Sequence, residues 1–291
     1  MDDADPGLLG PGSVAWRVLG HPMSLVGGMR ALMIQALHPL AMAGVAQHSD
    51  YKSRSLDRLR QTAYYVTATA FGDTATAHAA AKRVRAVHRR VRGVDPVTGR
   101  PYSAADPDLQ IWVHCTEWHS LLAAYRVFAG PLTEDEQDQY LAEGAVIGSL
   151  LGTPRESIPA SRSEYREYFE RVRPQLCVSE HARQAIEFVI HPPVVRETLH
   201  LQGPMRLFAS AAVALVPRHL RAMAGIDRPW WQDQLAVNAA RPWGTVLTLP
   251  GVRDLPRHLF GGDTHEIARR ARHLYRANVS APRQPDHATT A

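Results

Sequence analysis

Residues 23–47 read MSLVGGMRALMIQALHPLAMAGVAQ and carry a strong helical pattern. Apolar side chains recur every three or four positions as far as Leu37, which predicts a helix with one apolar face. His38-Pro39 then breaks the pattern, because proline lacks an N–H group and restricts the residue before it, so a second helix is expected from Pro39 to Gln47. The apolar face of the first helix comprises Leu25, Met29, Leu32, Met33 and Ala36.

The same stretch is too short and too polar for a transmembrane helix. A helix that crosses a membrane needs about 20 consecutive apolar residues. The nearly apolar run of residues 31–46 is shorter, and Gln35, His38 and Pro39 interrupt it. We therefore expect a buried helix pair and no membrane span.

Helical patterns continue along most of the chain, with recognisable caps. Ser55 or Asp57, Asp73, Asp106 before Pro107, and Thr133 with Glu136 are suitable helix starts. The only strand-like run, residues 245–249, is too short and solitary to build a sheet. The expected class is all-α: a single-domain helical bundle over residues 13–278, with disordered segments at 1–12 and 279–291. Helices are expected at 14–19, 23–37, 39–47, 55–70, 73–92, 106–129, 133–152, 163–172, 179–190, 204–215, 217–224 and 264–277.

The cysteines and the charged residues indicate the compartment of the protein and the kinds of surface it carries. Cys115 and Cys177 are the two cysteines, and the acidic start of the chain has no secretory pattern, so reduced thiols in the cytoplasm are expected. The net charge is +5, and six basic residues crowd between Lys82 and Arg92. Such a cluster forms a solvated face, a nucleic-acid surface, or a site for the carboxylates of a cofactor.

His88 is the first candidate ligand. At 3.6 residues per turn it shares one side of the 73–92 helix with Ala77 and Ala81, whose small side chains leave room for a flat ring system. A neutral imidazole there is either a core residue with both nitrogens bonded or a ligand of haem iron. Arg85 and Arg92, about one turn away, suit the carboxylates of such a cofactor.

Five more residues, in three places, are candidates. Arg58, Gln61 and Thr62 share one patch of the preceding helix, which is either a solvated face or a polar pocket that holds dioxygen by hydrogen bonds. His114 points inward from the 106–129 helix and is the second candidate ligand, or a core histidine. His38, at the break before Pro39, either lines a pocket or ties down the backbone.

Other metal and catalytic chemistries find no support in the sequence. A helical di-iron site needs two Glu-x-x-His pairs, and only Glu197 with His200 provides one. There is no zinc-protease, nucleophile-elbow, phosphate-loop or dinucleotide-binding motif. The basic residues encircle their helix without forming one stripe, so no nucleic-acid partner is expected.

In order and spacing, several short motifs resemble the family that includes bacterial latex-clearing rubber oxygenases and the fungal MpaB oxygenase. The resemblance covers residues 27–159, about half of the chain, and continues more weakly to the C-terminus. Its landmarks are Gly28-Met29-Arg30-Ala31-Leu32, Gln35-Ala36-Leu37-His38-Pro39, Arg58-Leu59-x-x-Thr62, His88-x-x-Val91-x-Gly93, Tyr102-Ser103-Ala104 and Trp112-Val113-His114.

The resemblance implies a globin-like helical core that holds one non-covalent haem b, with His88 as the proximal iron ligand. The distal Arg-x-x-Lys-Thr motif of the rubber oxygenases falls on Arg58, Gln61 and Thr62, with glutamine in place of lysine. Their distal glutamate falls near Met42, where no carboxylate stands. Lysine ligation and the specific polyisoprene-cleaving mechanism are therefore not expected to carry over.

The function expected from this resemblance is a haem-dependent oxygenase. Its partners would be dioxygen and a small hydrophobic substrate, such as an isoprenoid or another unsaturated lipid, held by apolar groups of residues 23–46. A non-enzymatic haem carrier or sensor is the alternative, and a haem-free basic helical module that binds DNA is the third. The sequence leaves a homodimer open.

Overall fold

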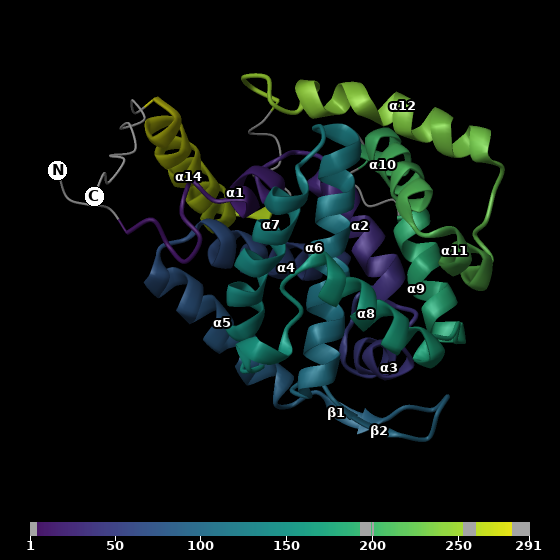
Figure 1. The fold of residues 1–291 in the computed structure, drawn as a ribbon. Helices are drawn as coiled ribbons and strands as arrows, with labels where there is room; N and C mark the ends of the chain where they lie inside the picture. Colours follow the sequence, from purple (N-terminus) through teal and green to yellow (C-terminus); the bar gives the residue numbers. More distant parts are fainter. Residues whose placement is uncertain (1–4, 193–198, 200, 253–259, 281–291) are drawn as a thin grey trace, which may run out of the picture.

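A computed structural model describes residues 5–192, 199, 201–252 and 260–280 of the chain. The fold is all-α, as predicted, with one small two-stranded sheet in the described part (Figure 1). The helices are α1 (Val14–Leu19), α2 (Ser24–Gln35), α3 (Pro39–His48), α4 (Ser55–Phe71), α5 (Thr74–His88), α6 (Pro107–Phe128), α7 (Glu134–Ser149), α8 (Arg162–Val172), α9 (Glu180–Ile190), α10 (Gln202–Leu215), α11 (Arg218–Ala224), α12 (Trp230–Val246) and α14 (Gly262–Ser280). Short 3₁₀ turns occupy Arg155–Ser157 and Arg173–Gln175.

Helix α6 runs through the centre of the molecule, and α2 packs closely along it (Figure 1). The close approach depends on Gly27, where a Cβ atom would lie 2.9 Å from both the Leu121 Cα and the Ser120 carbonyl oxygen. Arg30 is buried at the same crossing and donates to the Ser120 hydroxyl at 2.6 Å and the Leu215 carbonyl at 2.7 Å. The glycine-containing landmark at the start of α2 therefore has a packing role.

The second landmark, Gln35 to Pro39, fastens α2 to α6. The Trp112 indole donates to the Gln35 carbonyl at 3.2 Å, and the Gln35 side chain donates to the Val113 carbonyl at 3.1 Å. His38 is the N-cap residue of α3, with Pro39 in the first turn, which confirms the predicted break. No single helix in the described residues is long and apolar enough to cross a membrane; the α2–α3 pair passes that test only together, across a bend of 103°.

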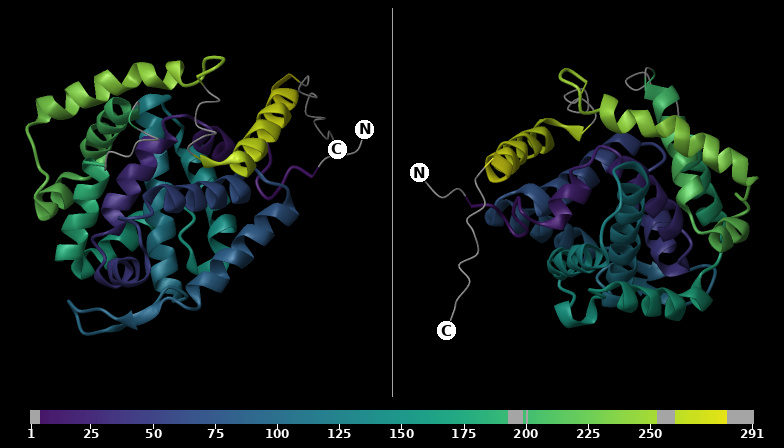
Figure 2. Two further views of the ribbon diagram at one scale, coloured as in Figure 1. Left: turned by 180° about the vertical axis from the view of Figure 1, so that it is seen from behind. Right: turned by 45° about the horizontal axis from the view of Figure 1, so that its top comes forward.

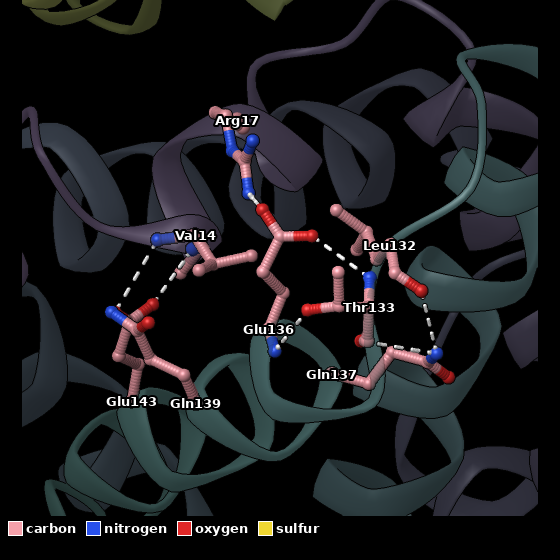
Figure 3. Close-up of polar contacts among 9 residues, drawn as sticks. Val14, Arg17, Leu132, Thr133, Glu136, Gln137, Gln139 and Glu143 are labelled. Atoms are coloured by element: carbon pink, nitrogen blue, oxygen red, sulfur yellow. Dashed lines mark hydrogen bonds and ion pairs between the residues drawn. The ribbon is translucent and has the colours of Figure 1, made fainter.

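Helix α7 supports α1 through carboxylates. Glu143 accepts the Val14 and Ala15 N–H groups at 3.3 and 2.7 Å, and Arg17 pairs with Glu136 at 2.5 Å (Figure 3). Glu136 also closes the predicted capping box with Thr133. A carboxylate near the positive end of a helix offsets its unpaired N–H groups, so this contact stabilises a helix of only six residues.

Three local predictions are wrong. The helix after Asp73 ends at His88 and not at Arg92, because Arg92–Val94 (β1) pairs antiparallel with Pro101–Ser103 (β2) inside the segment predicted as a loop. The strand-like run 245–249 is the end of α12 and a turn, and α12 itself was not predicted. Helix α4 begins after Arg54, whose side chain makes no cap bond, so neither Ser55 nor Asp57 is the N-cap.

The N-terminal segment makes contacts in the part that the structure describes. Residues 5–12 form turns, and Asp5 accepts the Thr74 N–H at 2.8 Å at the start of α5. Leu8 and Leu9 pack partly buried against the core. The disorder predicted for 1–12 therefore does not describe residues 5–12, while residues 1–4 and 281–291 lie outside the described residues.

Candidate functional site

His88 ends α5, on the side of the helix that faces α4. Its side chain is half-buried, and its Nδ1 atom is buried without a hydrogen-bond partner. Burial, followed by the positive charge of Arg58, lowers the pKa of His88 below the usual value of 6.5. The imidazole is therefore neutral near pH 7, which is the form that binds a metal.

Arg58 lies on α4, within electrostatic reach of His88, so two of the predicted site residues come together from neighbouring helices. Helices α4 and α5 follow one another through Gly72 and Asp73 and pack together (Figure 2). Gln61 and Thr62 are exposed on α4, and no described contact joins them to His88. The structure thus brings the arginine of the predicted distal group near the histidine, and leaves the amide and hydroxyl on the surface.

The two other predicted arginines lie in different surroundings. Arg85 is half-buried on α5, one turn before His88, and its guanidinium donates to the Leu150 carbonyl after α7. Arg92 is exposed in β1 and donates to the Arg89 carbonyl at 3.2 Å. Because α5 ends at His88, Arg92 does not share a helical face with that histidine, whereas Arg85 does.

Glu117 is a feature of this region that the sequence reasoning missed. It lies half-buried on α6, and burial raises its pKa to about 7. Burial also raises the pKa of Tyr65 on α4, with a further contribution from Glu117 and an opposing one from Arg85. Tyr65 on α4 therefore lies within electrostatic reach of both Glu117 on α6 and Arg85 on α5, and Arg85 is one turn before His88.

His114 lies one turn before Glu117 on α6 but is enclosed on both sides. Its ring centroid is 5.5 Å from that of Trp118, and a Cβ atom at Gly148 on α7 would lie 3.1 Å from its Nδ1 and Cε1 atoms. Its Nε2 atom is buried without a hydrogen-bond partner, and burial lowers its pKa to about 3. The ring is neutral and lies enclosed between α6 and α7.

His38 lies in a different place, at the start of α3. It is 5% exposed, its ring centroid is 5.6 Å from that of Trp112, and its Nδ1 atom is buried without a hydrogen-bond partner. It lines a cavity whose other walls are the 97–100 and 174–177 segments. This agrees with the pocket-lining role, one of the two that the sequence predicted for His38. No described contact connects His38 with His88.

The described residues contain no group of three or more His, Cys, Asp or Glu side chains placed to hold a metal ion. Haem iron requires only one axial side chain from the protein. His88 fits that requirement through a neutral ring with an unbonded nitrogen and nearby cations at Arg58 and Arg85. Ala77 and Ala81, on the same face of the helix, are completely buried.

The fold is all-α, and His88 on α5 has an unbonded buried nitrogen with Arg58 of α4 nearby. The chain belongs to the family described as ER-bound oxygenase mpaB/B'/Rubber oxygenase, catalytic domain, whose model matches residues 16–247. This confirms the resemblance inferred from the short motifs and places the chain in an oxygenase family.

Curated relatives add little about activity. Two uncharacterized proteins, Mb2261 of Mycobacterium bovis and Rv2237 of Mycobacterium tuberculosis, are each 28% identical to this chain over 137 residues, 46% of this chain and 51% of theirs. The matched part thus spans about half the length of these relatives. No solved structure shows significant similarity to the chain.

Proposed function

We propose that this protein is an oxygenase that binds haem b through His88 and uses dioxygen to oxidise a small hydrophobic substrate. The observation that carries the proposal is the state of His88, a neutral, half-buried imidazole with an unbonded Nδ1 atom on a helix face of small residues. Membership of an oxygenase family supports the reaction class.

The chain would hold the cofactor with few groups. His88 would supply the axial nitrogen, and haem b would supply the chemistry that activates dioxygen. Arg58 and Arg85 are the cations next to His88 and Tyr65, so we assign them to the propionate carboxylates. Gln61 and Thr62 are exposed on α4, so they would hydrogen-bond dioxygen only where a bound cofactor covers that face of the helix.

Glu117 would handle protons in this region. With its pKa raised to about 7 by burial, its carboxyl group exchanges a proton near neutral pH, as an effective acid–base group should. Position 42, by contrast, holds a buried methionine in the core. If proton transfer assists the reaction, we assign it to Glu117 on α6.

The substrate is assigned only by class. The apolar side chains of residues 23–46 that were expected to hold it, among them Met29, Met33 and Met42, are mostly used in the packed core. An unsaturated hydrocarbon remains the proposal, because the matched family description includes a rubber oxygenase.

The test uses two hydrocarbons that differ only in unsaturation. The haem-loaded protein is incubated with squalene or with its saturated counterpart squalane, and oxygen uptake and products are measured by electrode and mass spectrometry. We expect oxygenated products from squalene that require both haem and dioxygen, and none from squalane. Haem binding without oxygen-dependent product from squalene would overturn the oxygenase assignment in favour of a haem carrier or sensor.

A further inference from the structure

The cavity lined by His38 lies where α3 begins, and His88 is not among its lining residues. It has a volume of about 420 Å³, within the range of small-molecule sites. Three segments form its walls: the start of α3, the tip of the β1–β2 hairpin, and the segment after α8. Its lining residues are His38, Pro39, Leu40, Val97, Thr98, Arg100, Pro174, Gln175, Leu176 and Cys177.

The polar groups of this cavity favour an anion. Arg100 brings a positive charge, and no carboxylate is among the lining residues. The nearest acidic residue in sequence, Asp95, is 1% exposed, and its oxygens accept the Thr98 N–H at 2.8 Å, the Thr98 hydroxyl at 2.6 Å and the Val97 N–H at 3.3 Å. The Asp95 carboxylate is therefore hydrogen-bonded within the hairpin. No described residue forms an ion pair with Arg100.

His38 provides the second, independent sign of a ligand. It is 5% exposed at the wall of the cavity, its Nδ1 atom has no hydrogen-bond partner, and the side chain of Gln175, which also lines the cavity, lies close to its ring. A buried polar atom without a partner is unfavourable and rare in folded proteins, so a site that retains one commonly pairs it with a bound group. A neutral imidazole can donate one hydrogen bond to a carboxylate oxygen through the tautomer that carries its proton on Nδ1.

Most of the other lining side chains are apolar, so the part of a ligand that they contact should be apolar too. Leu40, Val97 and Leu176, with Pro39 and Pro174, offer no charge and no hydrogen-bonding side chain. A molecule that fits both parts has an anionic head group and a short hydrocarbon body. We propose that this cavity binds a small amphipathic carboxylate, with Arg100 and His38 at the carboxylate and the apolar side chains around its chain.

Cys177 gives a local readout of occupancy. It lines the cavity and is half-buried, whereas the other cysteine of the chain, Cys115, is completely buried. A small neutral thiol reagent such as methyl methanethiosulfonate should therefore label Cys177 selectively in the folded protein. The haem-free protein suffices for this measurement, so the outcome does not depend on the proposed function at His88.

The experiment measures the labelling rate of Cys177 with sodium octanoate, octanol or acetate at up to 10 mM. Octanoate should slow labelling at least fivefold at saturation, while octanol and acetate, which lack the charge or the hydrocarbon body, should need at least tenfold higher concentrations. Arg100→Gln should raise the octanoate concentration for half-protection at least tenfold. The matched control Arg90→Gln, an exposed arginine outside the cavity, should behave as the wild type.

Three results would overturn the proposal. They are no protection by octanoate at 10 mM, equal protection by octanol, and unchanged protection in a folded Arg100→Gln protein. Circular dichroism of each variant shows whether it is folded, and isothermal calorimetry of the wild type with octanoate gives the stoichiometry, which should be one per chain.

Discussion

Replacing Glu117 by glutamine should stabilise the haem-free protein at pH 8 and change little at pH 5. Burial raises the Glu117 pKa from its usual value near 4.5 to about 7. Because the folded-state pKa lies above the unfolded-state value, the stability that this group contributes is complete below pH 4.5 and is lost as the pH rises through 7. The full loss amounts to about 3 kcal/mol, and glutamine, which has a similar shape and no charge, avoids it.

The assay is urea unfolding of both proteins, followed by circular dichroism at pH 5, 6, 7 and 8. The free energy of unfolding of Glu117→Gln relative to wild type should rise with pH, most steeply between 5 and 7. Glu156→Gln, at an exposed glutamate without a described partner, is the control and should shift it by under about 0.5 kcal/mol at each pH. Parallel pH curves for wild type and Glu117→Gln would refute the claim that burial raises the pKa of this carboxyl group.

Two further predictions test the packing and the buried histidine. Gly27→Ala should lower the free energy of unfolding by about 2 kcal/mol, because its Cβ would lie 2.9 Å from the backbone of α6. The control Gly28→Ala has nothing within 4 Å of its Cβ, so it should raise the free energy of unfolding by up to about 1 kcal/mol. Equal shifts in the two variants would contradict the close α2–α6 crossing. Burial lowers the His114 pKa to about 3, so the free energy of unfolding falls as the pH drops below 6.5. Between pH 6.5 and 4.5, the free energy of unfolding measured with urea should fall by about 2 kcal/mol more in the wild type than in His114→Gln. An identical fall in both proteins would show that the ring is accessible to solvent.

Much of the fold follows from local signals in the sequence. Asp73, Asp106 and Thr133 accept N–H groups at the starts of α5, α6 and α7, and Pro39 begins α3, all as predicted. The β1–β2 hairpin was missed because three-residue strands have no readable alternation. Helix α12 was missed because only Ala236, Ala240 and Gly244 are buried along it, so its apolar face is narrow.

The site could be predicted only in part, for a related reason. Periodicity placed His88 on the inner side of its helix, and its neutral, half-buried ring agrees with that placement. Helical periodicity does not indicate which helices converge, so the position of Tyr65 within electrostatic reach of both Glu117 and Arg85 left no sequence signal. Arg92 was assigned to the site on the assumption that the helix continued through it, and the hairpin removed it from that face.

The role of His88 is tested most directly by haem stoichiometry. Wild type, His88→Ala, His114→Ala and His38→Ala are each incubated with haemin, freed of excess by gel filtration, and measured by absorption and pyridine haemochromogen. The account predicts about one haem b per chain with a Soret band in the wild type and in folded His38→Ala and His114→Ala, and loss of both in His88→Ala, with haem restored by added imidazole. Full haem retention by His88→Ala with an unchanged Soret band, or a wild type that binds no haem, would contradict it.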